Sequence, residues 1–396
     1  MLREPPPTAG LPLFWRDFLP SNASLEQNLA AFLGQPQTQI ECSGTAAMMV
    51  ALATLKRLSN RRSVVIPAYT CPWVPLAILR CGLRPVLCDT KKNHFDFCPE
   101  ALKSVCGDDT LAVIPTHLSG RIADLKSAAD IAHQCGAYLV EDAAQALGAR
   151  WQGQLAGTLG DIGCYSLGVG KGLTIYAGGA VIARDDNLQQ RLRATAKEIC
   201  PSSIAWEARR LIELTGYYLL YRPLGLGMAF GWSLRRNLKK KQLIEAVGDD
   251  CSPNFPLHQV GRWRKTIGAH ALQRLPDFIA LTTAQALRRK ARLTAIAGIS
   301  VMEDNDGDSG TWPYFLVLMP SQQARDKALA QLWPAELGVG RLFIHALPDY
   351  DYLRFDSTDT PNARDFAART LTITNSLWLE EDDFLQICKV LEQSLV

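Results

Sequence analysis

A single lysine stands between two glycines near the middle of the chain, in the run Gly170-Lys171-Gly172. It comes soon after an apolar run at residues 162–165. Because glycine has no side chain beyond a hydrogen, a flat ring can approach this lysine with little obstruction. A deprotonated lysine amine can attack a carbonyl carbon. Lys171 is therefore a candidate for covalent catalysis.

The Gly170-Lys171 pair also invites comparison with a nucleotide-binding P-loop. That motif requires glycine five positions before Gly170 and serine or threonine directly after the lysine. The chain has Tyr165 and Gly172 at these two positions. The P-loop interpretation therefore fails.

Two carboxylates and an amide follow the apolar run at residues 138–140, as Glu141, Asp142 and Gln145. A buried carboxylate needs a cationic partner, because an unpaired charge in the interior is costly. A protonated pyridine nitrogen would be such a partner. The alternative is that Glu141 or Asp142 only caps the helix that follows.

Residues 43–47 open a helix-length segment with Ser43, Gly44 and Thr45. Ser43 is a good N-cap candidate. A glycine at a helix start lets an anion approach free backbone N–H groups, and Thr45 adds a hydroxyl. These residues predict a phosphate-binding site, and plain helix capping is the alternative.

The elements that must position these residues are visible as short apolar runs that alternate with helix-length segments. The runs are partly β-branched and bounded by Pro, Gly or Asp, as is typical of buried strands. They lie at residues 64–67, 85–88, 111–114, 137–140 and 180–183, with helical spacing at 124–135. This alternation predicts a mainly parallel sheet covered by helices on both faces, with ligands at the carboxyl ends of the strands.

The 396 residues suit about two globular domains. We expect a large domain at residues 1–260, with an apolar and basic insertion at about 195–250, and a smaller C-terminal α+β domain at 261–396. In the smaller domain, residues 314–318 are strand-like and residues 322–332 and 382–395 are helical. The net charge of +3 gives no support for a general nucleic-acid role.

Eleven cysteines are scattered along the chain without any C-x-x-C pair. This pattern predicts no metal site of the zinc-ribbon type and favours a reducing compartment. The beginning of the chain, with three prolines at residues 5–7, lacks the apolar core of a secretory signal. We therefore expect a cytoplasmic protein.

The order and spacing of these motifs resemble the DegT/StrS family, whose members are aminotransferases that use pyridoxal 5'-phosphate (PLP) and act mostly on nucleotide-linked keto sugars. The matching stretches are residues 42–47, 65–70, 117–124, 141–146 and 160–166. The resemblance implies the type I fold of PLP-dependent transferases, with a mainly parallel sheet sandwiched by helices and a smaller C-terminal α+β domain. It also implies transfer of an amino group from a donor such as glutamate to a keto sugar, in surface polysaccharide or secondary-metabolite biosynthesis.

The resemblance also implies a role for each matched residue. Lys171 would form the Schiff base with PLP, Asp142 would pair with the pyridine nitrogen, and Gln145 would contact the ring or its phenolic oxygen. Three residues would bind the phosphate, namely Gly44, Thr45 and Ser166.

The chain departs from the family where an aromatic side chain usually stacks on the PLP ring, because Cys71 occupies that place. Trp73 and Tyr69 are the alternatives for stacking. The family also implies a homodimer in which a segment of the neighbouring subunit reaches the phosphate. The corresponding residues here are 254–259, in which one of three side chains would serve, namely Asn254, His258 or Gln259.

Two other functions are compatible with this fold. Some relatives of the family are sugar dehydratases, but they replace the Schiff-base lysine with histidine, so Lys171 favours transamination. A non-catalytic binding or sensor protein is the second alternative. Side chains that could contact the substrate, although a structural role is favoured for each, are His117, Tyr69, Trp73, Tyr176 and His345.

Residues 205–241 have no counterpart in the family pattern and are rich in large apolar side chains. Glu213, Arg222 and Pro223 interrupt the run, so a membrane-spanning helix is not expected. The segment would pack on the large domain or at the dimer interface. Alternatively, it would rest on a membrane, with its Tyr and Trp side chains at the headgroups and five basic residues near anionic lipid, namely Arg235, Arg236, Lys239, Lys240 and Lys241.

Overall fold

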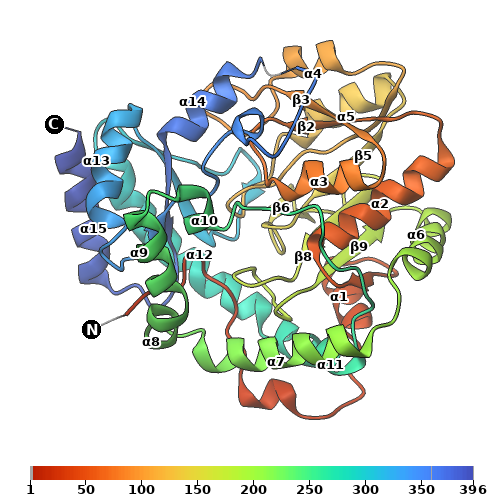
Figure 1. Cartoon of the computed structure of the whole chain (residues 1–396), viewed down its shortest axis with the longest axis horizontal. Coiled ribbons are helices and arrows are strands. Elements are labelled where there is room, and N and C mark those ends of the chain that lie inside the picture. Colours follow the sequence, from red (N-terminus) through yellow and green to blue (C-terminus); the bar gives the residue numbers. More distant parts are fainter. Residues whose placement is uncertain (1–2, 358, 396) are drawn as a thin grey trace.

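The five strands predicted between residues 64 and 183 all occur, with small shifts at their ends, in one seven-stranded sheet. The computed structural model describes residues 3–357 and 359–395 (Figure 1). In sheet order the strands are β1 (Gln39–Glu41), β9 (Gly179–Ala183), β8 (Ile162–Ser166), β5 (Tyr138–Asp142), β4 (Thr110–Val113), β2 (Ser63–Pro67) and β3 (Arg84–Cys88). The strands from β8 to β3 are parallel, and β9 is antiparallel to both of its neighbours. The prediction of a mainly parallel sheet is confirmed.

Helices cover both faces of this sheet, because successive strand residues point to opposite sides. Val64 and Ile66 of β2 pack in a core that includes α2 (Gly44–Leu58), α3 (Trp73–Arg80) and α6 (Asp186–Ile199). Val65, between them, packs on the other side. That side is covered by α4 (Pro99–Val105), α5 (Leu125–Gln134), α1 (Leu25–Leu33) and α11 (Arg262–Leu272).

A second, antiparallel sheet forms the smaller part of the molecule, at the left in Figure 1. Its strands, in order, are β10 (Ser300–Val301), β12 (Tyr314–Leu318), β14 (Thr370–Thr374) and β13 (Val339–Gly340). The helices around it are α12 (Leu275–Thr294), α13 (Gln322–Leu332), α14 (Pro361–Arg369) and α15 (Glu381–Ser394). The predicted strand at 314–318 and the predicted helices at 322–332 and 382–395 are confirmed.

A third, small sheet connects the two parts. Three two-residue strands pair with one another, namely β6 (Arg150–Trp151), β7 (Gln154–Leu155) and β11 (Asp308–Ser309). Single turns of helix lie at Trp15–Phe18 and Leu347–Asp349.

All eleven cysteines carry free thiols.

The segment that the sequence marks as an insertion is helical. It contains α7 (Ile204–Leu220), α8 (Pro223–Leu226), a π-helical turn (Gly227–Gly231), α9 (Trp232–Lys239) and α10 (Leu243–Val247). The helix α7 ends just before Pro223, as expected from the missing N–H of proline. Leu234 and Ala246, although they lie before residue 260, pack in the core of the smaller sheet. The assignment of residues 1–260 to one domain stays a prediction. Within the residues that the structure describes, every helix is too short or too polar to cross a membrane.

Candidate active site

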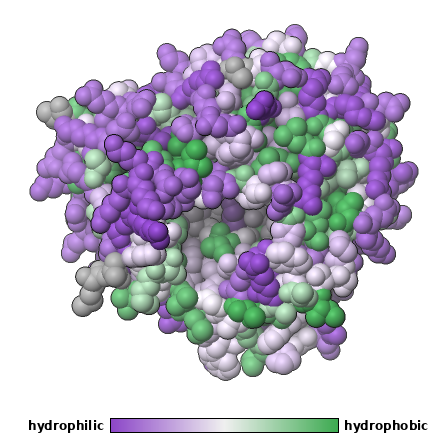
Figure 2. All heavy atoms as spheres, viewed as in Figure 1, coloured by the Kyte–Doolittle hydropathy of each residue, from purple (hydrophilic) through white to green (hydrophobic). Residues whose placement is uncertain are grey.

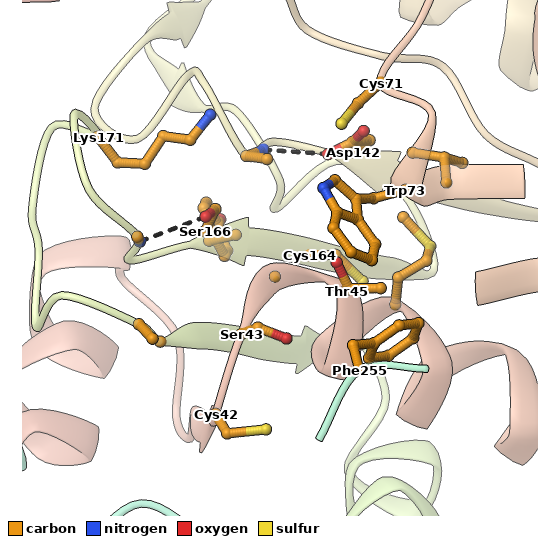
Figure 3. Close-up of a pocket in the computed structure, with 18 of the residues that line it drawn as sticks. Cys42, Ser43, Thr45, Cys71, Trp73, Asp142, Cys164, Ser166, Lys171 and Phe255 are labelled. Carbon is orange, nitrogen blue, oxygen red and sulfur yellow. Dashed lines mark hydrogen bonds between the residues drawn. The ribbon is translucent and has the colours of Figure 1, made fainter. Parts of the chain in front are cut away.

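The six residues to which the resemblance assigns a catalytic or cofactor-binding role line one cavity of about 530 Å³ (Figure 3). They are Gly44, Thr45, Asp142, Gln145, Ser166 and Lys171. The cavity lies where β5 ends at Asp142 and β8 ends at Ser166, and where α2 begins. This is the place where parallel sheets bind ligands.

The start of α2 combines helix capping with an open anion-binding position. The Ser43 hydroxyl accepts a hydrogen bond from the Ala46 N–H at 3.0 Å, which confirms the N-cap. Gly44 and Thr45, in the first turn, face the cavity beside Ser166. A side chain at Gly44 would place its Cβ 3.0 Å from the Ser166 Cβ, a tight contact for which Ser166 would have to shift by a few tenths of an ångström. The site therefore offers hydroxyls and the positive end of a helix to a phosphate.

Glu141 has a structural role in the core. Its carboxylate accepts hydrogen bonds from three backbone N–H groups, those of Gly157, Leu159 and Gly160, at 2.5 to 2.7 Å. The His117 Nδ1 accepts the Ala123 N–H, so its Nε2 carries the hydrogen that is donated to Glu141 at 3.0 Å. Glu141 and His117 are both fully buried.

Asp142, by contrast, faces the cavity although only 5% of its surface is exposed. Its carboxylate accepts the Ala144 N–H at 3.2 Å. Burial raises the pKa of Asp142 and lowers the pKa of Lys171. The positive charge of Lys171 partly offsets the rise at Asp142, and the negative charge of Asp142 partly offsets the fall at Lys171. Figure 3 shows the Lys171 side chain pointing across the cavity toward Asp142. A cationic ring nitrogen at Asp142 would compensate its buried charge.

Gln145 is held by a tyrosine that sequence reasoning missed. The Gln145 Oε1 accepts hydrogen bonds from the Ser119 N–H, at 3.1 Å, and from the Tyr314 hydroxyl. Because the Ser119 N–H can only donate, the Gln145 atom that faces it must be the amide oxygen. The side-chain N–H₂ of Gln145 is therefore left as a donor. That donor fits the phenolic oxygen of a PLP ring. Tyr314 belongs to β12, so the smaller sheet supports the site.

The two aromatic residues that were considered for stacking lie in different places. Tyr69 is fully buried and packs edge-on against Phe343 and Phe366, outside the cavity lining. Trp73 lines the cavity, as does Cys71, whose thiol has its pKa raised to about 12 by burial. Trp73 is therefore the remaining candidate for stacking.

The segment that was expected to reach the phosphate of a neighbouring subunit lies at the cavity of its own chain. Asn254 and His258 line this cavity, and Phe255, between them, packs edge-on against Trp73 with ring centroids 5.5 Å apart. The Gln259 N–H is bound to the Pro201 carbonyl, and Gln259 does not line the cavity.

Further polar side chains also line the cavity. Tyr176 and His117, both predicted substrate contacts, lie there, and so does Arg210 of α7, which sequence reasoning missed. The spacing of residues around Arg210 carries no signal of a site. His345 lines a different cavity, together with Arg341 and Trp333.

The family model of the DegT/DnrJ/EryC1/StrS aminotransferases matches residues 14–210 and 263–392. The chain belongs to this family. One relative, the protein MosB of Rhizobium meliloti, is 34% identical over a segment covering 43% of this chain and 33% of MosB. A UDP-N-acetyl-3-dehydro-alpha-D-glucosamine 3-aminotransferase of Acidithiobacillus ferrooxidans is 33% identical over 43% of this chain and 46% of that enzyme. The chain thus matches less than half the length of these curated relatives.

Solved structures of the DegT/DnrJ/EryC1/StrS family share the fold. The apo-form of a putative sugar aminotransferase, Spr1654 from Streptococcus pneumoniae, has a TM-score of 0.76 at 17% identity, covering 99% of this chain and 97% of that one. A structure of DesI with its TDP-sugar product has a TM-score of 0.73 at 21% identity, covering 94% and 84%. The family depends on PLP. The residues of this cavity fit that cofactor, with a phosphate position at α2, a buried carboxylate at Asp142 and an amine at Lys171.

Proposed function

We propose that this chain is a PLP-dependent aminotransferase that moves an amino group from an amino-acid donor such as glutamate to a nucleotide-linked keto sugar in the cytoplasm. The observation that carries this proposal is the convergence of Lys171, Asp142 and the start of α2 on one cavity. The retained Lys171 distinguishes the chain from the dehydratases that have histidine at this place. The names of the curated relatives support the class of substrate.

Each residue has a chemical task in this proposal. PLP, when bound, supplies a ring that draws in the electrons left when the substrate Cα loses its proton. The buried Lys171 amine, whose pKa is lowered, takes the proton from Cα and returns it at the C4' carbon. Asp142 keeps the ring nitrogen protonated, and Gln145 donates to the phenolic oxygen. Gly44, Thr45 and Ser166 hold the phosphate and so fix the ring.

The cofactor assignment is tested by reduction with borohydride. The purified protein with PLP should absorb visible light and lose this band on reduction, because the bond between PLP and a lysine amine is reduced. Peptide mass spectrometry should then find the adduct on Lys171. Recovery of the adduct on another lysine would show that Lys171 is not the attachment site.

We further propose a homodimer with shared active sites. The surface of α7 to α9 supports an interface, since large apolar side chains are exposed there, namely Ile204, Ile212, Leu219, Leu224, Met228 and Trp232. Figure 2 shows apolar residues along the lower edge of the molecule, where α7 lies.

Mixing two inactive variants tests whether the sites are shared. The hybrid dimer combines a Lys171→Ala subunit with an Asn254→Ala, His258→Ala subunit. One intact site forms in it if residues 254–259 of each subunit complete the site of the neighbouring subunit. No intact site forms if the segment acts within its own chain. Asn254 and His258 line the cavity of their own chain in the described structure, so activity returns in the hybrid only if the dimer passes this segment to the neighbouring subunit. A hybrid without activity would show that each chain completes its own site and would contradict the shared site. Sedimentation should show a dimer, and an active monomer would contradict it.

Contact with a membrane is a second proposal for the same surface. Trp232, Arg236 and residues 239–241 are exposed, and hydrophilic side chains gather over α9 in Figure 2. However, Tyr217 and Tyr221 stack on each other in the interior, and Arg235 is paired with Glu4 and Glu336. These three side chains cannot meet lipid as the sequence suggested. Flotation with anionic liposomes, repeated at high salt, separates this role from dimerisation.

A further inference from the structure

A second cavity, of about 860 Å³, lies between the junction of α9 and α10, the helix α13 and residues 341–345. It shares no lining residue with the cavity of Lys171. One wall consists of residues 238–245, which lie outside the two ranges that match the family model. This cavity therefore depends on a segment in which the chain departs from its family.

The lining of the second cavity has an excess of positive charge. Four side chains are cationic, namely Lys239, Lys241, Arg325 and Arg341. Two are carboxylates, Glu245 and Asp326. The net excess of two positive charges in a concave site favours an anionic ligand.

Arg325 is the residue that most favours an anionic ligand. Its side chain carries a charge, yet only 3% of its surface is exposed. Its Nε lies 2.8 Å from a carboxylate oxygen of Asp326, a side chain that is itself 56% exposed. Within residues 3–357 and 359–395, the Arg325 Nη1 has no hydrogen-bond partner. A buried donor without a partner is costly, so a ligand that accepts from it would gain binding energy.

Arg341 lies close enough for its charge to act on Arg325. Its Nη2 donates to the Ile344 carbonyl at 2.5 Å and to the Ala367 carbonyl at 2.8 Å, which orients the guanidinium. Its Nε is buried without a partner among the described residues. Burial, together with repulsion from Arg325, lowers the pKa of Arg341 to about 10. A bound anion would relieve this repulsion.

The remaining lining is apolar and includes Leu243, Ile244, Leu329 and Trp333. A cavity of this size suits a small organic molecule. A phosphate monoester carries close to two negative charges at neutral pH and has several acceptor oxygens, which match two guanidinium groups. We propose that this second cavity binds an organic phosphate, with the phosphate at Arg325 and Arg341 and the apolar part against α10 and α13.

The test is calorimetric titration of the PLP-loaded protein with UMP, with uridine and with inorganic phosphate. Loading with PLP fills the phosphate position of the cofactor. UMP bound where the nucleotide of the proposed substrate would lie is distinguished by variants of the second cavity, which leave the active site unchanged. We expect UMP to bind and uridine, which lacks the phosphate, not to bind at this site. Binding of inorganic phosphate as tight as that of UMP would identify phosphate itself as the ligand, and weaker binding would identify an ester that uses the apolar wall.

Variants assign the binding to this cavity. Arg325→Gln should weaken UMP binding by about tenfold or more, since a hydrogen bond to a charged group is lost. Lys241→Gln, at an exposed position of the lining, should weaken it by about twofold to fivefold. Lys240→Gln is the matched control, because Lys240 is exposed next to Lys241 but does not line the cavity, and its affinity should stay unchanged.

Lys241→Gln also protects the test against misfolding, because replacing the buried Arg325 can disturb α13 and replacing Lys241 on the surface does not. Equal affinities in the wild type, Arg325→Gln and Lys241→Gln would overturn the proposal. So would the absence of UMP and phosphate binding at millimolar concentration. These outcomes do not depend on catalysis, so they leave the proposed aminotransferase function untouched.

Discussion

The Lys171→Ala variant is expected to lose amino transfer almost completely, with the rate of the half-reaction with glutamate falling by about four orders of magnitude. The variant lacks the amine that would hold PLP covalently and move the proton between two carbon atoms. Stopped-flow spectra of the variant loaded with PLP measure this rate directly. Lys197→Gln, on the exposed side of α6, is the control and should react like the wild type. A Lys171→Ala rate within tenfold of the wild type would contradict the assignment.

The pH dependence of PLP capture gives an independent signature of Lys171. The amine attacks only in its neutral form. Burial lowers the pKa of Lys171, so the neutral form persists to lower pH than for a free lysine, whose pKa is about 10.4. The rate of PLP capture should therefore rise with pH to a plateau. The midpoint of this rise should lie below the pKa of free lysine. A midpoint at or above the value of free lysine would mean that the amine is solvated.

The part of the site that the sequence could predict is the part set by strand ends. Asp142 is the last residue of β5 and Ser166 the last residue of β8, two strands that pair in parallel. Because the carboxyl ends of parallel strands meet at one edge, these residues had to lie near each other. Gly44 joins them since α2 begins beside β8, where a larger side chain would press on Ser166.

The family resemblance assigns Asp142 to the ring nitrogen, but residue types and spacing alone could not decide between Glu141 and Asp142. Neighbouring strand residues point to opposite faces, so only one of the two could face the cavity. Which one does depends on the loop at residues 157–160, whose N–H groups meet Glu141. That contact joins segments whose spacing carries no local signal.

Side chains that reach the cavity from distant parts of the sequence could not be predicted, for the same reason. Tyr314 reaches Gln145 from the smaller sheet, and Arg210 reaches the cavity from α7. In the segment 205–241, the helical geometry of α7 turns Tyr217 inward, and Arg235 meets Glu4 from the beginning of the chain. Composition shows that such a segment is apolar and basic, but it does not show which face is covered.

Asp142→Asn is expected to keep PLP bound while slowing the half-reaction with glutamate by about 100-fold to 1000-fold. The phosphate position at Gly44, Thr45 and Ser166 and the amine of Lys171 are unchanged in this variant, so binding persists. A neutral amide stabilises a protonated ring nitrogen far less than a carboxylate does. Stopped-flow spectra of the loaded variant measure the rate, and titration with PLP measures the binding.

Glu141→Gln is the matched control, because it makes the same change at the adjacent carboxylate. Glu141 accepts three backbone N–H groups and the His117 Nε2 in the core, so its replacement should cost about 1 to 3 kcal/mol of unfolding free energy. The folded fraction of Glu141→Gln should still react at close to the wild-type rate, since this side chain does not face the cavity. An unchanged half-reaction in Asp142→Asn would mean that Asp142 does not pair with the ring nitrogen. Equal slowing in both variants would mean that the rate reports the stability of β5 and not the charge at the ring.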